Sequence, residues 1–272
     1  MSLLHLTELN IYPIKSCGAV AREQIEIDRF GLKSDRRWML VDERGVFVTQ
    51  RKCPKMAHIK ASIRNGALQI QLGERTLLVE QKSLEAEKVL KVTVWRDICE
   101  ALPAPSAINQ AISHYLGLGP CTLVYMPETV QRLVDKDYAK LGETVSFADG
   151  FPLLLTTTPS LQQFNRWLRK NGANTGVSMQ RFRPNLVLDG CEAFAEDHWS
   201  VIKIGEILFD VVKPCARCAI PTINPETLEK EPAVFKTLKQ HRGREGDVYF
   251  GQNLIPRGTG MLRMGDQVEL LE

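Results

Sequence analysis

Apolar and polar residues alternate along much of the first hundred positions. Leu9 and Ile11, and later Ile25 and Ile27, are each separated by a single polar residue. Side chains two positions apart lie on the same face of a strand, so this period predicts strands with one buried face. Further short apolar stretches predict strands at residues 38–41, 46–48, 62–64, 68–72, 76–79 and 92–95.

Two turns join these predicted strands into hairpins. Asp42–Gly45 separates one pair, and Asn65-Gly66 separates the next. Asn-Gly is the strongest short hairpin signal, because both residues adopt the positive φ angles that a two-residue turn requires. Short strands at this spacing predict a barrel or sandwich rather than alternating strands and helices.

Helical spacing appears beyond residue 100. Apolar residues recur at intervals of three or four positions in two segments: Ile108, Ile112 and Leu116, then Leu161, Phe164 and Leu168. The first helix is expected to end at Gly117–Pro120. Thr158 can cap the second, with Pro159 at its first position and Asn171-Gly172 after its end. A short third helix is predicted near residues 232–241.

Strands are also predicted in this second region. They lie at residues 121–126, 186–188, 202–204 and 207–211, with a last pair of short strands between 262 and 271. We therefore predict a mostly β fold with a few helices (α+β). The change in composition places a soft boundary near residue 100, between an N-terminal region of residues 1–100 and a second region of residues 101–272.

Composition excludes several classes of protein. The 272 residues carry a net charge of +3 without a long Lys/Arg block, so nucleic-acid binding is not indicated. No stretch reaches about 18 apolar residues, and the N-terminus does not have the pattern of a secretory leader. Seven cysteines without paired spacing argue against a disulfide framework. We expect a soluble, cytoplasmic protein that does not bind membranes.

The most informative chemistry lies in the C-x-x-C pair Cys215 and Cys218. Structural zinc would need two further ligands in a close pair, and no second C-x-x-C or His pair is present. A redox dithiol would favour a helix after the first cysteine, but Pro221 and Pro225 follow closely. Two interpretations stay open on physical grounds: one thiolate ligates a large group, or both thiols are inert.

Basic residues next to predicted strands are candidates for binding an anion. Lys15-Ser16 follows the first strand, Arg36 precedes another, and Arg183 and Asn185 flank a proline. Lysine supplies a charge and arginine a bidentate fork for such groups. Each segment alone is equally compatible with an exposed loop or a surface salt bridge. Glu196-Asp197 could act as acid and base, but adjacent carboxylates more often cap a turn or pair with an arginine.

Taken in order, the segments resemble the MOSC-domain family, and within it the members that reduce amidoximes and N-hydroxylated compounds. The resemblance runs from about residue 3 to residue 271. The segments that carry it are Ile11–Cys17, Gly31–Val41, Thr49–Arg51, Phe182–Asn185, Ala195–Trp199, Cys215–Cys218 and Phe250–Asn253.

The resemblance implies a MOSC β-barrel fold preceded by a smaller, β-barrel-like N-terminal region. It also implies a molybdenum–pyranopterin cofactor in a positively charged cleft. By position in C-x-R-C, Cys218 would be the thiolate ligand of the metal and the catalytic residue. The residues that match cofactor-binding positions are Lys15, Ser16, Arg36, Arg183, Asn185 and Arg217. A soft thiolate suits such a metal, and Arg217 beside it is expected to lower the thiol pKa.

The activity that the resemblance implies is reduction of small N-hydroxylated compounds by oxygen-atom transfer. The chain has neither the ferredoxin-type cysteine run of some bacterial relatives nor a G-x-G-x-x-G turn, so we expect electrons from a separate flavin reductase or ferredoxin. That partner is expected to dock on basic surface around Lys33 and Arg36. Two alternatives remain: a carrier or sulfur-transfer module for the cofactor, and an interaction protein without a cofactor. Cys191 is expected to be a buried structural thiol.

Overall fold

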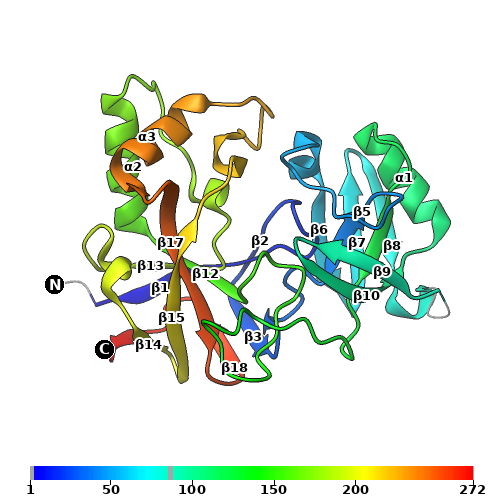
Figure 1. Cartoon of the computed structure of the whole chain (residues 1–272), viewed down its shortest axis with the longest axis horizontal. Coiled ribbons are helices and arrows are strands. Elements are labelled where there is room, and N and C mark those ends of the chain that lie inside the picture. The colour runs from blue at the N-terminus through cyan, green and yellow to red at the C-terminus, as the bar shows by residue number, and fades with distance from the viewer. Residues whose placement is uncertain (1–2, 85–87, 272) are drawn as a thin grey trace.

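The computed structural model describes residues 3–84 and 88–271. Two lobes lie side by side, and the chain begins and ends in the same one (Figure 1). Residues between 38 and 125 form the other lobe, after which the chain returns to the first. Most elements are strands, and the described residues contain three α-helices, so the predicted mostly β class is confirmed.

The larger lobe is built on a nine-stranded sheet. Along its main path the strand order is β19-β14-β15-β17-β12-β13-β1-β2, and β16 lies beside β17. The strands are β1 (His5–Ile11), β2 (Val20–Arg22), β12 (Leu153–Thr157), β13 (Leu186–Asp189), β14 (Val201–Ile204), β15 (Ile207–Ala216), β16 (Gly243–Arg244), β17 (Asp247–Pro256) and β19 (Val268–Leu270). The first strand of the chain therefore belongs to a sheet formed mainly by the C-terminal half.

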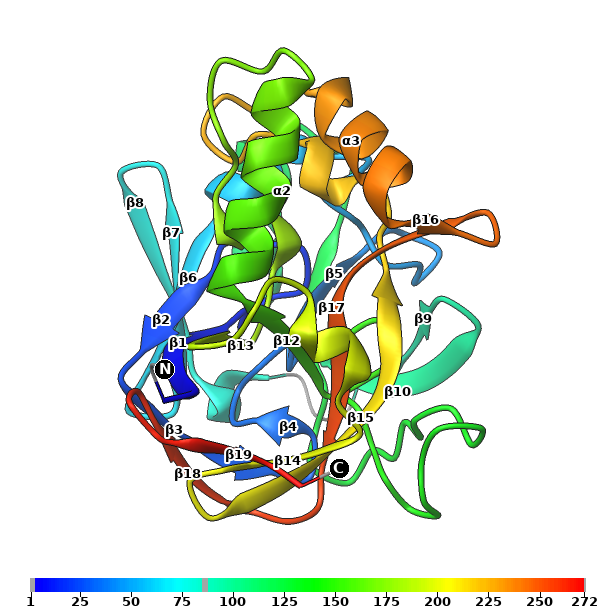
Figure 2. The same ribbon diagram turned by 90° about the vertical axis from the view of Figure 1, so that its left-hand side faces the viewer.

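Helices α2 (Thr158–Lys170) and α3 (Pro232–Arg242) lie together over one end of this sheet (Figure 2). Phe164 and Leu168 of α2 are buried against Val234 and Leu238 of α3, as the apolar spacing predicts. The predicted cap was wrong by one residue. The side chain of Thr157 accepts the backbone N–H of Ser160, because Pro159 lies in the first turn and donates no N–H.

The smaller lobe contains two antiparallel sheets and one helix. Their strands are β5 (Trp38–Val41), β6 (Lys60–Arg64), β7 (Ala67–Leu72), β8 (Arg75–Val79), β9 (Leu90–Val94), β10 (Asp97–Pro103) and β11 (Thr122–Tyr125). Helix α1 (Ser106–Leu116) packs Ile112 and Leu116 into the same core as the β6–β8 sheet. The predicted boundary near residue 100 marks a change in composition, and as a division between domains it stays a prediction.

Local turn chemistry explains most of this lobe. Asn65 and Gly66 both have positive φ and join β6 to β7 as predicted. The stretch 46–48 forms only isolated bridges, in which Phe47 pairs with Val41 and Val46 with Thr93. Strand β10 was not predicted, because its charged and proline residues hide the apolar alternation.

A fourth sheet, of three strands, closes the underside of the larger lobe. It has the order β18-β3-β4, with β18 (Gly260–Arg263), β3 (Gln24–Asp28) and β4 (Gly31–Leu32). The last two strands of the chain, predicted around Gly265-Asp266, are both present but separate. Strand β18 pairs with β3, whereas β19 pairs with β14.

A long connection between β11 and β12 crosses from one lobe to the other. Arg132 holds its shape, donating to the carbonyl oxygens of Ser146 and Ala148 and to Asp97 at the start of β10. This buried arginine therefore fixes the end of the connection, where Asp149 faces the space between the lobes.

None of the described helices has both the length and the apolar character needed to cross a lipid bilayer.

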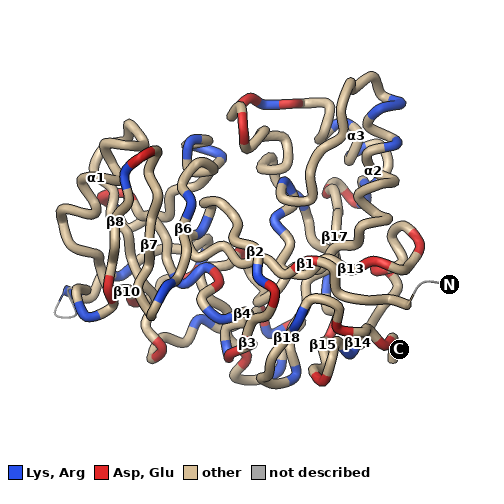
Figure 3. The backbone as a smooth tube through the Cα atoms, turned by 180° about the vertical axis from the view of Figure 1, so that it is seen from behind, with Lys and Arg blue, Asp and Glu red and all other residues tan. Residues whose placement is uncertain are grey.

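Lysine and arginine residues are dispersed over both lobes rather than gathered on one face (Figure 3).

Candidate cofactor cleft

A cleft of about 810 Å³, a volume that includes solvent at its mouth, lies between the two lobes. Its lining includes all seven residues predicted for the site: Lys15, Ser16, Arg36, Arg183, Asn185, Arg217 and Cys218. Residues up to 203 positions apart thus meet in one place, although their roles in binding stay a prediction.

Tyr12, directly after β1, is the base of the cleft's cationic wall. The guanidinium carbons of Arg36 and Arg183 lie 4.3 and 4.2 Å from the centroid of its ring. The Tyr12 hydroxyl donates to the carbonyl oxygen of Pro184 at 3.1 Å, and burial raises its pKa to about 12. The phenol therefore stays neutral and serves as an aromatic platform for two cations.

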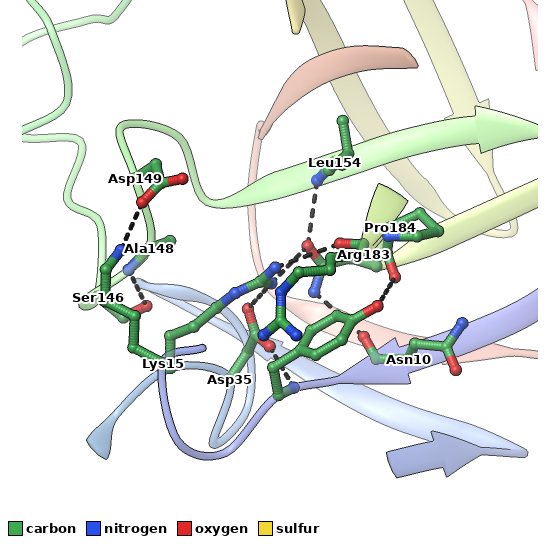
Figure 4. Close-up of polar contacts among 12 residues, drawn as sticks. Asn10, Lys15, Asp35, Ser146, Ala148, Asp149, Leu154, Arg183 and Pro184 are labelled. Atoms are coloured by element: carbon green, nitrogen blue, oxygen red, sulfur yellow. Dashed lines mark hydrogen bonds and ion pairs between the residues drawn. The ribbon is translucent and has the colours of Figure 1, made fainter. Parts of the chain in front are cut away.

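Arg36 is held in place on several sides. Asp35 and Leu154, which belong to this hydrogen-bond network, are labelled in Figure 4. Its NH1 group donates to Asp35 Oδ2 at 2.5 Å and to Asn185 Oδ1 at 2.9 Å. The Asn185 amide also accepts from the backbone of Leu154 and donates to the carbonyl oxygen of Asn10. Since protein partners occupy this amide, Asn185 orients Arg36 within the wall.

Arg183 has no carboxylate within hydrogen-bonding distance among the described residues. Its NH1 group donates to the carbonyl oxygen of Cys17 at 2.8 Å, and its backbone has φ = 57°. Burial lowers the pKa of Arg183, and the nearby charge of Arg36 acts in the same direction. A left-handed, half-buried arginine without an acidic partner is costly, which is typical of a residue kept for a ligand.

Lys15 is buried at the opposite end of this wall. Its ammonium donates to Asp149 Oδ1 at 2.5 Å and lies 5.5 Å from the centroid of Phe47. Burial lowers the pKa of Lys15, and Asp149 partly offsets that effect. Ser16, with φ = 67°, makes the turn that aims both residues at the cleft.

The thiols come from the end of β15. Its pairing with β17 is irregular between Pro214 and Ala216, and such bulges re-aim side chains near functional sites. Both Cys215 and Cys218 are half-buried in the cleft lining. Arg217 was expected beside the Cys218 thiolate, but its NH1 group donates to Cys215 Sγ at 3.0 Å instead. The two cysteines are therefore distinct: one is engaged by arginine, and the other has no hydrogen bond among the described residues.

The residues present fit an anionic group of several acceptors. Five cationic side chains line the cleft: Lys15, Arg36, Arg51, Arg183 and Arg217. Asp149 supplies the single carboxylate among the described lining residues. The Nε of Arg217 is buried and lacks a hydrogen-bond partner in the described part of the chain. Buried polar atoms are normally paired, so this nitrogen indicates a missing acceptor. A thiol beside it suits a soft metal.

Glu196 and Asp197 lie away from the cleft. Asp197 forms an ion pair with Arg242 at 2.7 Å and accepts from Gln252, which confirms the arginine-paired alternative. Glu196 is buried and accepts from the hydroxyls of Thr157 and Ser160. Neither carboxylate is among the residues that line the cleft, so neither is placed to act as acid or base there.

Cys191 was expected to be buried but is half-buried. Burial of the thiol is still sufficient to raise its pKa to about 11.

Several lining residues were not predicted. Asp149 and Trp95 have no local pattern that distinguishes them from ordinary loop or strand residues. Arg51 and Asn253 lay within the segments Thr49–Arg51 and Phe250–Asn253 that carried the family resemblance, but they were assigned no role. The contact between Lys15 and Asp149 spans 134 residues of sequence, which is why spacing did not reveal it.

Comparison with known proteins gives two family matches that together span most of the chain. The MOSC N-terminal beta barrel domain matches residues 3–118, and the MOSC domain matches residues 142–269. Mitochondrial amidoxime-reducing component 1 of Xenopus laevis is 31% identical, over 97% of this chain and 81% of that protein. Its Homo sapiens counterpart is 30% identical, over 98% and 82%. Human molybdenum cofactor sulfurase is 29% identical over 97% of this chain, which corresponds to 32% of the sulfurase.

Proposed function

This chain belongs to the MOSC-domain family, and we propose that it is a molybdenum-cofactor-dependent reductase of N-hydroxylated compounds. The observation that carries the proposal is the free thiol of Cys218 in a cleft with five cations and one carboxylate. The relatives named as amidoxime-reducing components, which this chain matches over most of its length, support the same reaction class.

In this proposal the cationic wall binds the anionic part of the cofactor. Arg183 and the unpartnered Nε of Arg217 supply hydrogen bonds that no described residue takes up. Arg36 is preoriented by Asp35 and Asn185, so little side-chain entropy is lost on binding. Lys15 and Ser16 line the opposite end of the same cleft. The Cys218 thiolate is the protein ligand of the metal.

When bound, the cofactor would accept the oxygen of an N–O bond, together with two electrons from a donor. Overall, an N-hydroxylated compound, two electrons and two protons give the reduced nitrogen compound and one water. This chain's own residues position the reactants. The neutral Tyr12 platform keeps Arg36 and Arg183 aligned, and the ion pair of the buried Lys15 with the exposed Asp149 anchors the connection that forms the rim.

The test begins with metal content. Protein purified from a host that makes the cofactor should contain close to one molybdenum per chain and reduce benzamidoxime with reduced viologen. Protein that folds but contains no molybdenum when produced in such a host would refute the proposal.

A separate electron donor is part of the proposal. The chain has no G-x-G-x-x-G turn for a dinucleotide, and the five cysteines outside the C-x-x-C pair are isolated in sequence. Purified protein should therefore not turn over with NADPH alone, but should do so once a flavin reductase or ferredoxin partner is added. Turnover with NADPH alone would mean that a second redox site exists in this chain.

We propose that the electron donor docks at the cleft mouth on the basic surface around Lys33 and Arg36. The Arg36 side chain is 12% exposed, and the exposed Lys33 is paired with Glu26 at 2.6 Å. Lys33 therefore offers more of this surface to a partner than Arg36 does.

A second function is favoured by the match to molybdenum cofactor sulfurase. A carrier or sulfur-transfer module would bind the same cofactor in the same cleft and would not reduce N-hydroxylated compounds. Protein that contains molybdenum, has no reductase activity with reduced viologen and delivers cofactor to an apo-enzyme would support that role instead.

A further inference from the structure

Trp95 has a backbone conformation that tryptophan rarely adopts. It opens the two-residue turn between β9 and β10, where Val94 pairs with Asp97, and its φ is +57°. The first position of such a turn favours glycine or asparagine, since bulky side chains are strained at positive φ. A large aromatic residue here costs stability, so its retention needs a reason beyond the turn.

Contacts hold the Trp95 ring at the cleft mouth rather than against the core. Its indole N–H donates to Asp149 Oδ1 at 3.0 Å, and its ring centroid lies 5.1 Å from that of Phe47. The guanidinium of Arg51 lies 4.8 Å from the ring centroid. Trp95 nevertheless remains 46% exposed and lines the cleft, so a fixed aromatic surface faces an entering molecule.

Asp149 adds a hydrogen-bond acceptor beside this surface. Lys15 and Trp95 both donate to the same oxygen, Oδ1. No hydrogen bond from the described residues reaches Oδ2, and the Asp149 side chain is 70% exposed. One oxygen thus fixes the rim to the cofactor wall, while the other is open to a ligand that carries an N–H group.

We propose that Trp95 and Asp149 form a specificity site that selects flat, conjugated N-hydroxylated groups bearing an N–H, such as amidoximes and N-hydroxylated aminoheterocycles. The proposal rests on the proposed reductase function and narrows its substrate class. The π-face of the substrate stacks on Trp95, and its N–H donates to Asp149 Oδ2. Tertiary amine N-oxides, which offer neither a conjugated plane nor an N–H, gain nothing from this site.

Binding without turnover tests the site directly. Without a reductant, benzamidoxime should quench the fluorescence of the protein saturably, because Trp95 is the one strongly exposed tryptophan among the described residues. Trp95→Gly should weaken binding about tenfold, as expected for loss of an aromatic contact. The Trp95→Gly variant lacks the fluorescent reporter, so its Kd for benzamidoxime should be measured by calorimetry. Trp167→Phe, which alters a tryptophan stacked on Phe194 away from the cleft, is the matched control and should bind normally.

Folding stability separates a binding role from a structural one. Glycine adopts positive φ freely, so Trp95→Gly should melt at the same temperature as the wild type or higher. If the variant instead melts well below the wild type, Trp95 is kept for the fold, and the proposal is wrong.

Turnover with reduced viologen supplies the second measurement. Trp95→Gly should raise KM for benzamidoxime about tenfold and leave KM for trimethylamine N-oxide unchanged, with Trp95→Phe intermediate. Equal changes for both substrates would overturn the specificity site while leaving the reductase function intact. A wild-type protein that reduces neither substrate would refute the reductase function, and the binding measurement would still decide whether the site selects amidoximes.

Discussion

Two groups of charged residues lie within the larger lobe and at its edge, and they differ in how completely they are paired. Under α3, the Asp197 carboxylate accepts from Arg242 and Gln252, with Arg244 at 3.7 Å. In the cleft, Arg183 reaches only a backbone carbonyl, and Arg217 has a buried nitrogen without a described partner. We call the first group the Asp197 clamp and the second the cleft wall.

The difference teaches how to separate structural from functional charge. In the Asp197 clamp a carboxylate pairs with the cations, so the cost of burying these charges is offset within the protein. The cleft wall has more cations than the protein supplies partners for, which is unfavourable unless a ligand completes it. Excess charge of one sign and unmet hydrogen bonds therefore point to the cleft as the site.

The largest expected effect is at the thiols of the cleft. Cys218→Ser should abolish reductase activity and reduce molybdenum content, because the metal loses its protein ligand. Cys215→Ser should keep most of the activity, since Cys215 contacts Arg217 and is not the expected ligand. Activity with reduced viologen and metal analysis give the comparison. Equal losses in both variants, with folding intact, would instead support a disulfide-cycling pair.

The next two predictions each remove one arginine, first from the Asp197 clamp and then from the cleft wall. Arg242→Ala leaves the Asp197 carboxylate half-paired and removes contact with the Phe194 ring, so it should destabilise the fold by about 3 kcal/mol. Cofactor retained per folded chain should stay unchanged. Urea unfolding and molybdenum content measured on the same samples separate the two quantities.

Arg183→Ala should do the opposite. Removing a charge-assisted contact worth about 1.5–3 kcal/mol should weaken cofactor retention about tenfold or more. The apoprotein should be as stable as the wild type or more so, because a half-buried cation without a carboxylate partner is removed. A marked loss of apoprotein stability would show that Arg183 belongs with the structural arginines.

The smallest effect concerns pH and Glu196, which lies next to the Asp197 clamp in sequence. Burial raises the pKa of Glu196, although hydrogen bonds from Ser160 and Thr157 partly oppose this. The folded state then holds the proton more tightly than the unfolded state. The stabilisation that Glu196 contributes is fully present below its unfolded pKa and is lost as pH rises through the raised pKa of the folded state.

Glu196→Gln removes the titrating group and keeps the shape. Its stability should therefore fall less than that of the wild type between pH 4 and pH 8, an interval that begins just below the ordinary glutamate pKa. Unfolding free energies from urea titrations at both pH values provide the measurement. Parallel profiles for the two proteins would mean that Glu196 does not titrate in this range.

Local rules made much of the fold predictable. The hairpin at Asn65-Gly66 and the apolar stripe of α2 follow from turn chemistry and residue spacing, and both are present. Strand β10 was missed because charged residues and a proline interrupt its apolar alternation. The stretch 46–48 was predicted as a strand but forms only isolated bridges. The irregular connection that carries Asp149 has no periodic signal, so its place at the cleft could not be predicted.

The sequence by itself determined which chemistry is present: two thiols, a set of arginines and lysines, and an order of segments that resembles one family. Only the tertiary structure decided which of them meet. Lys15 and Arg183 converge because β1 pairs antiparallel with β13, which brings residues 5–11 and 186–189 into one sheet. Arg217 turns to Cys215 because β15 is irregular at its end. Strand pairing across such distances depends on the burial of whole sheet faces, and no local spacing records that energy.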